Sequence, residues 1–598
     1  MIRLRALRLR LWGGAEDGIA MVTVIAITAV LATFVIAGIA VSVGTMKKSH
    51  NDQDWNGALA AAYAGVEDYQ SKLANDPSYV RFGNAASPFT ASPASSVSTP
   101  HVPNPAFGLG TAGTWAEVPG SDGTAHFRYE VNNSSYYTNG ALTLRSTGRV
   151  GDVTRTIYAD LKQSGFVDYV YFTNYETIDP FNTSSACYAY AYEGRPSSCS
   201  KINFASGDEI DGPVHSNDRM VIECGATFRS PVTTAYNPAP PAIKYEKATA
   251  GSCTPNFAGG VAPTYAGNLP IPPTNSEMRK ETRFDLPTEV PLPGCLYTGP
   301  TSIQFHSDGT MTVRSPWTKF TQVQASGPGR NPNTPTANYC GTPGTSSGRL
   351  GHMNGQRIAV PNNNLIFVQN VPGLASDVNY SSPSTSLRLG GGYSAPAACS
   401  GTVNRNNLGY PVNNEDAPDN AYMCRNGDVF ISGVLEGRVT VTAENNIYVV
   451  GDVTYDDVDR DALGLVGQNA VIVWNPVRNK SYIGMSSGMR AYSGNCISGY
   501  CNTNRSIQAA ILSVQHTFMV QNTDVTSGNR GDLRVYGSIA QMFRGVVRWQ
   551  SGYTKDYVYD KKFRYTAPPK FLTPASTTYG VSTWVEVNPV FNPDGTYR

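Results

Sequence analysis

The sequence predicts an α+β protein with a long amino-terminal helix, a small antiparallel sheet and then a large, mainly β, β-helix-like region. Residues 19–46 carry no charged side chain and run on into a helical pattern, whereas residues 126–163 alternate apolar and polar side chains. Beyond residue 164, short apolar runs recur between Gly and Asn turns. Charged residues make up only 15% of the 598 residues, and this composition favours β structure with many turns.

The amino-terminal segment is predicted to cross a membrane. Residues 1–18 carry arginines at positions 3, 5, 8 and 10, and the uncharged run over 19–46 exceeds the roughly 20 residues that span a bilayer. Four arginines before this run hold the start of the chain in the cytoplasm and place the bulk outside. A cleaved secretory signal has a shorter apolar core of about 7–15 residues, although the string AGIA at 37–40 keeps that alternative open.

The helix is predicted to continue beyond the membrane, from Ile19 to Asn75, with Pro77 as its stop. At about 1.5 Å per residue it would be on the order of 85 Å long. Its outer part carries apolar residues at alternating spacings of four and three, which form one seam along a helix. The seam residues are Trp55, Leu59, Ala62, Val66, Tyr69 and Leu73.

The basic leader ending at Gly18, the GIAMV start and the string AAAYAGVE at 60–67 together resemble PilX-type minor pilins of type IV pilus systems. The resemblance implies that residues 1–18 are a leader and that a prepilin peptidase cuts after Gly18 and methylates Ile19. It also implies a transmembrane and assembly helix over 19–76, with other pilins and the pilus assembly machinery as partners. The protein would lie in the cytoplasmic membrane before assembly and in a pilus at the cell surface afterwards.

Thr23 departs from this resemblance. Most major pilins have glutamate as the fifth residue of the mature chain, where it is thought to pair with the terminal amine of a neighbouring subunit, and here that position is Thr23. A carboxylate in hydrocarbon is retained only where a partner neutralises it, and a first subunit has no earlier neighbour to pair with. The hypothesis is a tip or initiating position. The alternative is that Thr23 is simply a tolerated polar residue of a membrane helix.

Outside the membrane the sequence divides into three further segments. Residues 77–125 are rich in Ser, Pro, Thr and Gly and are expected to form a linker. Residues 126–163 are expected to form three or four antiparallel strands, and they resemble the small pilin sheet that packs on the outer half of the long helix. Residues 164–598 form the predicted β-rich extracellular cap, with rungs of short strands stacked on one another. A sandwich is the alternative, and residues 231–300 and 315–425 are interpreted as long insertions.

All ten cysteines lie beyond the apolar segment, and their even number predicts disulfides in an oxidising compartment. Sequence neighbours are expected to pair, Cys187 with Cys199 and Cys496 with Cys501 foremost. Zinc is disfavoured, because no Cys-x-x-Cys occurs and no histidine lies within four residues of a cysteine. The candidates are Cys187, Cys199, Cys224, Cys253, Cys295, Cys340, Cys399, Cys424, Cys496 and Cys501.

No Walker or His-Glu-x-x-His motif occurs. The string GLGTAG at 108–113 fits the dinucleotide fingerprint, but a Pro-rich stretch precedes it where a strand is required, so the sequence predicts no catalysis and no cofactor. His215 and His516 are interpreted as hydrogen-bonded core or turn residues. One dense group of carboxylates, which also has Asp452 beside it, is a candidate calcium site, although a solvated turn is the favoured interpretation because the EF-hand spacing is missing. The candidate ligands are Asp456, Asp457, Asp459 and Asp461.

The predicted function is that of a minor pilin or tip subunit, which initiates or caps assembly and contacts surfaces. Tyrosine-rich strings such as YAYAYEG at 188–194 suit contact with host or surface glycans, although strands are rich in tyrosine in any case. A net charge of +1 disfavours nucleic acid as a partner. Two alternatives are a membrane-anchored adhesin that never enters a pilus and an extracellular polysaccharide-acting β-helix enzyme.

Overall fold

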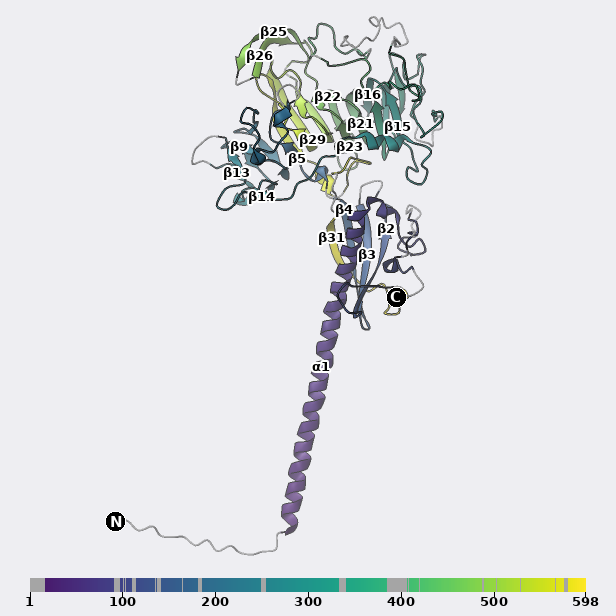
Figure 1. Ribbon diagram of the computed structural model, residues 1–598, viewed down its shortest axis with the longest axis vertical. Helices are drawn as coiled ribbons and strands as arrows, with labels where there is room; N and C mark the ends of the chain where they lie inside the picture. Colours follow the sequence, from purple (N-terminus) through teal and green to yellow (C-terminus); the bar gives the residue numbers. More distant parts are fainter. Residues whose placement is uncertain are drawn as a thin grey trace, which may run out of the picture.

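The molecule consists of one long helix, a small head on the outer part of that helix, and a larger β-rich cap beyond the head (Figure 1). The fold is therefore α+β, as the sequence predicts. The computed structural model describes residues 17–90, 97–100, 102, 104–109, 115–134, 136, 141–163, 165–180, 185–248, 254–332, 340–383, 406, 408–418, 420–486, 489–501, 503–526, 529–564, 566–574 and 579–598.

Helix α1 spans Asp17–Asn75, which is 59 residues or about 88 Å. Its end agrees with the sequence prediction: Asp76 N makes the last backbone bond, to the Lys72 carbonyl at 2.9 Å, and a short 3-10 helix begins at Pro77. Lys72 lies in the last turn, where a cation interacts favourably with the helix dipole, and it pairs with Asp68 one turn earlier at 3.2 Å.

The head is a five-stranded antiparallel sheet against which the outer part of α1 packs (Figure 1). Alternation of side chains along these strands places one face on the helix, and a single apolar core lies between the two. The strands, in their order across the sheet, are β1 (Ala116–Glu117), β2 (Ala125–Asn132), β3 (Ala141–Val150), β4 (Val153–Gln163) and β31 (Tyr579–Val587).

Glycines bring the helix and sheet unusually close together. A Cβ added at Gly148 on β3 would lie 2.0 Å from the Ala58 carbonyl oxygen and 2.2 Å from the Ala62 backbone nitrogen. On the helix side, a Cβ at Gly65 would lie 2.3 Å from Ser146 Oγ. All three distances are far below a van der Waals contact, so these two positions fix how deeply α1 lies on the sheet.

The carboxyl-terminal end of the chain returns to the head. Strand β31 pairs antiparallel with β4, from Tyr579 opposite Gln163 to Val587 opposite Thr156. The following tail packs on the sheet as well: Tyr597 OH donates to Glu130 at 2.6 Å, and the Arg128 guanidinium lies 4.1 Å from the Phe591 ring. The sequence assigned everything from 164 to 598 to the cap, whereas the structure divides this range and makes the cap an insertion between two neighbouring strands of the head.

The cap is built from short strands that stack mainly in parallel ladders. Those before residue 300 are β5 (Tyr171–Tyr175), β6 (Asn203–Phe204), β7 (Glu209–Asp211), β8 (Val214–Ser216), β9 (Val221–Ile222), β10 (Thr227–Phe228), β11 (Val232–Thr234), β12 (Glu246–Lys247), β13 (Asn256–Phe257), β14 (Thr264–Tyr265) and β15 (Cys295–Thr298). Those after it are β16 (Thr301–His306), β17 (Thr310–Arg314), β18 (Gln356–Ala359), β19 (Asn364–Gln369), β20 (Val429–Leu435), β21 (Arg438–Ala443), β22 (Ile447–Tyr455), β23 (Ala462–Gly467), β24 (Val471–Val473), β25 (Val477–Ser486), β26 (Met489–Cys496), β27 (Arg505–Ser513), β28 (Phe518–Val520), β29 (Asn529–Phe543) and β30 (Gly552–Tyr559).

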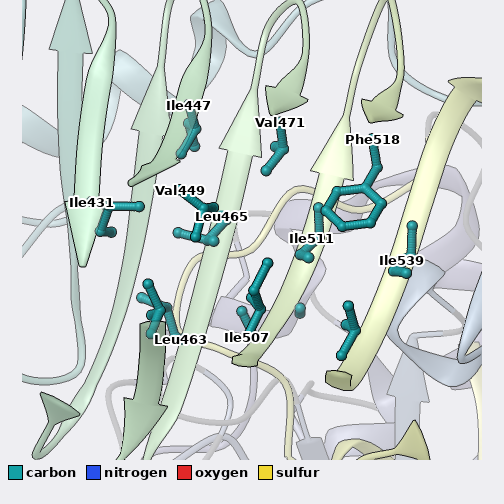
Figure 2. Close-up of a cluster of buried hydrophobic side chains, with 14 of the residues drawn as sticks. Ile431, Ile447, Val449, Leu463, Leu465, Val471, Ile507, Ile511, Phe518 and Ile539 are labelled. Atoms are coloured by element: carbon teal, nitrogen blue, oxygen red, sulfur yellow. The ribbon is translucent and has the colours of Figure 1, made fainter. Parts of the chain in front are cut away.

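Inward-facing side chains form continuous columns across these ladders, part of which Figure 2 shows. Each apolar residue packs on its register partner in the next strand, so the core is extended along the stack and no single strand buries its face alone. One buried column runs through Cys295, Ile366, Val441, Leu465, Ile511, Ile539, Tyr171, Val214 and Val232.

The stacking order differs from the chain order. The first strand of the cap, β5, lies beside its late strand β29, with Tyr171 opposite Ile539 and Tyr175 opposite Phe543. From β5 the chain builds toward β14, crosses to β15 and β16, and then returns rung by rung to β29. The stack is therefore closed where the chain enters and leaves the cap.

The two predicted insertions are only partly outside the stack. Strands β13 and β14 extend the ladders from β10 and β11, and β19, inside the range 315–425, lies between β15 and β21. The six residues of β19 are all buried, but their run is short and Gly- and Pro-rich segments surround it, which hid it in the sequence. The short 3-10 helices are η1 (Pro77–Arg81), η2 (Pro105–Phe107), η3 (Phe166–Asp168), η5 (Ser185–Cys187), η6 (Ala191–Glu193), η7 (Ala258–Gly260), η8 (Ser276–Thr282) and η9 (Lys561–Arg564).

Candidate functional site

The first half of α1 projects from the head, and its uncharged residues 19–46 form an apolar rod (Figure 1). Residues 21–53 are all exposed, including Phe34 at 71% and Val41 at 67%. Among the described residues, this helix is long and apolar enough to cross a membrane. Burial of apolar surface stabilises by about 25 cal/mol for each Å² removed from water. An apolar surface of this size therefore requires lipid or other protein around it.

Hydroxyl groups inside the apolar rod are satisfied by the helix itself. Thr28 Oγ1 donates to the Val24 carbonyl at 2.8 Å, and Thr45 Oγ1 donates to the Val41 carbonyl at 3.0 Å. Such bonds let threonine lie in hydrocarbon at little energetic penalty. Thr23 lies on the same exposed part of the helix. Gly18 and Ile19 lie in its first turn, and residues 1–16 of the leader are outside the described residues.

The predicted seam is where α1 leaves this exposed environment and enters the head core. Ala62, Val66, Tyr69 and Leu73 are fully buried against the sheet. Leu59 packs against the same core while partly buried. Trp55 differs, because it lies before the packed stretch and remains 51% exposed.

An aromatic surface lies where the helix meets the edge of the head. Tyr63 of the helix and Trp584 of β31 are 40% and 42% exposed, and their ring centroids lie 4.9 Å apart. We call Trp55, Tyr63 and Trp584 the helix-edge surface; the charged segment 47–54 separates it from the uncharged rod.

Arg155 fixes this surface. Its guanidinium makes two hydrogen bonds of 2.6 Å to the Glu586 carboxylate and lies 4.6 Å from the Trp55 ring centroid. The same hydrogen bonds lower the pKa of Glu586. Sequence reasoning missed the β31 side of this surface, because no local signal indicates that a strand over 400 residues away joins the head.

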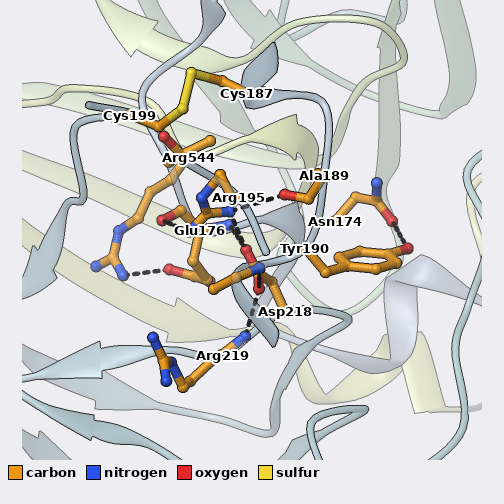
Figure 3. Close-up of polar contacts among 12 residues, drawn as sticks. Asn174, Glu176, Cys187, Ala189, Tyr190, Arg195, Cys199, Asp218, Arg219 and Arg544 are labelled. Carbon is orange, nitrogen blue, oxygen red and sulfur yellow. Dashed lines mark hydrogen bonds and ion pairs between the residues drawn. A yellow bond between two sulfur atoms is a disulfide. The ribbon is translucent and has the colours of Figure 1, made fainter. Parts of the chain in front are cut away.

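The cap contains two buried ion pairs, and one of them joins the first strands to the last (Figure 3). Arg544, after β29, pairs with Glu176, after β5, at 2.7 Å, and both side chains are at most 2% exposed. Arg195 pairs with the equally buried Asp218, whose pKa is raised because burial disfavours its charge. Each carboxylate is occupied by an arginine, so these groups stabilise the closure of the stack and are poorly placed for acid–base chemistry.

Three cysteine pairs form disulfides in the cap: Cys187–Cys199, Cys295–Cys340 and Cys496–Cys501. Cys224 and Cys424 are disulfide-bonded as well, and Cys253 and Cys399 lie outside the described residues. Disulfides of this number favour an oxidising compartment. The Cys187–Cys199 bridge closes the loop that carries Arg195 beside the buried ion pairs (Figure 3).

The aspartate group is arranged as a turn. Asp461 is fully buried; its carboxylate accepts from Asp457 N at 2.8 Å and from Gly437 N at 2.9 Å. Asp457 accepts from Asp459 N at 3.0 Å, and Arg460 lies within 3.8 Å of Asp457. Over the described part of the chain, no group of three or more His, Cys, Asp or Glu side chains is arranged to hold a metal ion. The geometry supports the turn interpretation.

The two histidines differ in their surroundings. His215 is buried, with Nδ1 2.8 Å from Thr233 Oγ1 and Nε2 3.0 Å from Asn217 Oδ1, and burial lowers its pKa to about 4. His516 pairs with Asp179 at 2.8 Å on the rim of a cleft of about 390 Å³. His215 is thus a core residue with both ring nitrogens hydrogen-bonded. His516, in contrast, faces a mainly apolar cleft between the stacked strands and the predicted insertion over 315–425.

No protein-family model matches the chain, and no curated protein sequence matches it either. Among solved structures, the chain is similar to the crystal structure of the competence-associated pilin ComZ from Thermus thermophilus. The two sequences are 12% identical, the alignment covers 89% of this chain and 97% of that chain, and the TM-score is 0.23. A TM-score this low does not establish a common fold, so function must rest on the geometry described above.

Proposed function

We propose that the protein is a pilin-like subunit whose apolar rod lies in the membrane first and then packs among the helices of a type IV pilus or related pseudopilus. The observation that carries this proposal is the division of one helix into a fully exposed apolar half and a half buried on a small antiparallel sheet. A simple anchor needs no helical continuation into a folded head. The helix-edge surface supports the proposal, because it offers a second, aromatic contact area where the helix meets the head.

We place this subunit at the tip of the fibre. The cap enters and leaves between β4 and β31, so it stands on the head at the end away from the rod (Figure 1). A body of that size would crowd its copies if it were repeated around a thin shaft. Thr23, where a glutamate would pair with an earlier neighbour, supports a first position in assembly.

Processing of the amino terminus tests the pilin assignment. In the native cell, mass spectrometry of the mature protein should find a methylated Ile19 at the amino terminus, because a prepilin peptidase would cut after Gly18. The variant Gly18→Leu should retain the leader and accumulate in the membrane. A mature chain that keeps Met1 or Arg10 would show a membrane-anchored adhesin outside the pilus, and the pilin proposal would fail.

Imaging tests the tip position. Purified pili labelled with an antibody against the cap should carry label at one end only, and deletion of the protein should reduce pilus number. Label along the shaft would defeat the tip position while leaving the pilin assignment intact. Thr23→Glu should lower pilus number or move the subunit into the shaft; no change in either would remove the role proposed for Thr23.

A surface glycan is the partner that we propose for the cap, and stacked tyrosines support it. The rings of Tyr190 and Tyr192 lie 5.2 Å apart, and those of Tyr192 and Tyr236 lie 5.6 Å apart. The rings cover part of each other's faces but remain partly exposed, so their free edges and hydroxyl groups can contact a sugar. A glycan array probed with the full chain should show binding that Tyr236→Ala reduces, whereas Tyr597→Ala in the head should not. Turnover of a bound polysaccharide would instead support the enzyme alternative.

A further inference from the structure

A two-stranded hairpin projects from the cap on the side away from the rod (Figure 1). Strands β25 and β26 form a two-stranded sheet, with Tyr482 opposite Tyr492 and Met485 opposite Arg490. Its base is tied down by the Cys496–Cys501 disulfide and by Lys480, whose Nζ lies 3.1 Å from the Asp524 carboxylate. Farther out, Tyr492 N donates to the Asp524 carbonyl at 3.0 Å, and beyond Tyr492 the described pairs belong to the ladder of the hairpin itself.

The outer part of this hairpin exposes large apolar side chains. Tyr482 is 57% exposed, Ile483 55% and Met485 62%. Successive residues of a strand point to opposite faces, so both faces of the ribbon present apolar groups to solvent. An isolated two-stranded hairpin gains little stability from such residues in water. Their exposure therefore indicates a contact surface.

The charges of the hairpin have one sign. Residues 477–496 contain Arg478, Lys480 and Arg490 and no Asp or Glu. Asp524 neutralises Lys480 at the base, whereas Arg478 and Arg490 are exposed. Arg490 lies opposite Met485 in the outer part of the hairpin, whereas Arg478 lies nearer the base than Lys480, so one exposed basic side chain accompanies the apolar groups. This arrangement complements a surface that carries anionic groups above an apolar interior.

We propose that this hairpin docks on an anionic lipid surface, with Tyr482, Ile483 and Met485 in the headgroup boundary and Arg490 on lipid phosphates or carboxylates. A lipid surface accommodates a convex tip without a shaped pocket, whereas a stable protein interface needs about 800 Å² on each side, which a hairpin tip does not offer. The proposal rests on the cap being outside the cell. It does not depend on assembly into a pilus.

Vesicle binding by the full chain tests this proposal. The protein is placed in a phosphatidylcholine nanodisc, which covers the apolar rod, and is then floated with vesicles of phosphatidylcholine alone or with about 30% phosphatidylserine. The chain should float with the anionic vesicles only. The double variant Ile483→Ser/Met485→Ser should bind at least about 10-fold more weakly, because two apolar side chains leave the boundary. Arg490→Gln should bind several-fold more weakly and lose part of its salt dependence.

The matched control is Leu292→Ser/Leu374→Ser, which removes two apolar side chains of 64% and 75% exposure elsewhere in the cap and should leave flotation unchanged. Equal binding to both vesicle types, or wild-type binding by the hairpin variants, would overturn the proposal. Association of nanodisc-held chains without vesicles, abolished by the hairpin variants, would identify a second protein as the occupant and also overturn it. Because flotation is independent of processing and imaging, its failure would leave the pilin assignment standing.

Discussion

The head and the cap bury the apolar faces of their β-strands in different ways. The head places a five-stranded antiparallel sheet against a helix, and glycine at 148 lets the two backbones approach each other. The cap stacks short parallel strands so that each one covers the next, and its core is a separate cluster from that of the head. The head therefore depends on a few close contacts, whereas the cap depends on closing a long stack.

Because the two cores are separate, we expect the head and the cap to unfold separately. A substitution where β5 pairs with β29 should unfold the cap while α1 remains packed on its sheet. A substitution where the helix approaches the sheet should unfold the head while the parallel ladders of the cap remain. Hydrogen exchange of the full chain, read peptide by peptide with mass spectrometry, distinguishes the two results.

The largest effect is expected for Glu176→Ala, which leaves the Arg544 guanidinium buried without its carboxylate. Loss of one partner of a buried pair typically costs about 3–5 kcal/mol of stability. Exchange should rise in the peptides of β5, β29 and their neighbours and stay unchanged in β2 to β4. The control Glu209→Ala removes a carboxylate from an exposed pair with Arg229 and should change little. Faster exchange throughout the head would contradict the separation.

The next effect is expected for Gly148→Ala in the head. The added Cβ meets backbone atoms of α1, which cannot move aside as a side chain does, so a loss of about 3 kcal/mol is expected. Exchange should rise in residues 58–73 and in β3, with the cap unchanged. Gly267→Ala places its Cβ in open space and serves as the control. Equal behaviour of the two variants would show that the close approach is unimportant.

A smaller effect is expected from pH at His215. Its pKa is about 4 in the folded cap against about 6.5 in the unfolded chain, so the unfolded state binds more protons between these values and stability falls as pH falls. The stability gap between wild type and His215→Gln should therefore narrow by about 2 kcal/mol from pH 7 to pH 5 in urea unfolding.

Asp428 provides the opposite sign as a control. Burial raises its pKa to about 7 from 3.8, so the folded state binds more protons between these values and its contribution increases as pH falls. From pH 7 to pH 5, the difference in free energy of unfolding between wild type and Asp428→Asn should change in the direction opposite to that for His215→Gln. A pH-independent gap in both variants would show that neither group is buried as described.

The smallest effect is expected for Glu586→Gln on the helix-edge surface. Its ion pair with Arg155 is bidentate but the carboxylate is 43% exposed, so the loss should be under about 1 kcal/mol. Thermal unfolding of the purified chain should hardly change. In cells, however, loosening of Arg155 from Trp55 should reduce incorporation into pili, and unchanged pilus number would count against this surface as an assembly contact.

The helix was the most predictable element. An uncharged run followed by a seam at spacings of three and four indicated its course, and Pro77 indicated its end, so Asn75 was correctly placed. The strands of 126–163 followed from their alternation. These signals are local, and local signals survive in a single sequence. The exception, Trp55, shows that helical spacing indicates a face but not where its covering begins.

The pairing of distant segments was beyond the sequence. Residues 579–587 alternate like any partly exposed strand, and nothing in them indicates that their partner is β4. The buried run 364–369 carries no local sign that it is a rung of the stack, because its neighbours β15 and β21 are distant in the sequence. The Glu176–Arg544 pair and the β31 half of the helix-edge surface could not be predicted for the same reason, because each joins residues hundreds of positions apart.

The position of the cap between β4 and β31 has a mechanical consequence. Both strands leave the head at the same end, where Gln163 lies opposite Tyr579. A force on the cap therefore pulls β4 and β31 in the same direction, parallel to the strands. The hydrogen bonds between β4 and β3 are then loaded in shear from Val153 to Lys162. Bonds loaded in shear resist together, whereas bonds at a peeled end break one after another. The double connection thus lets the head hold the cap against traction.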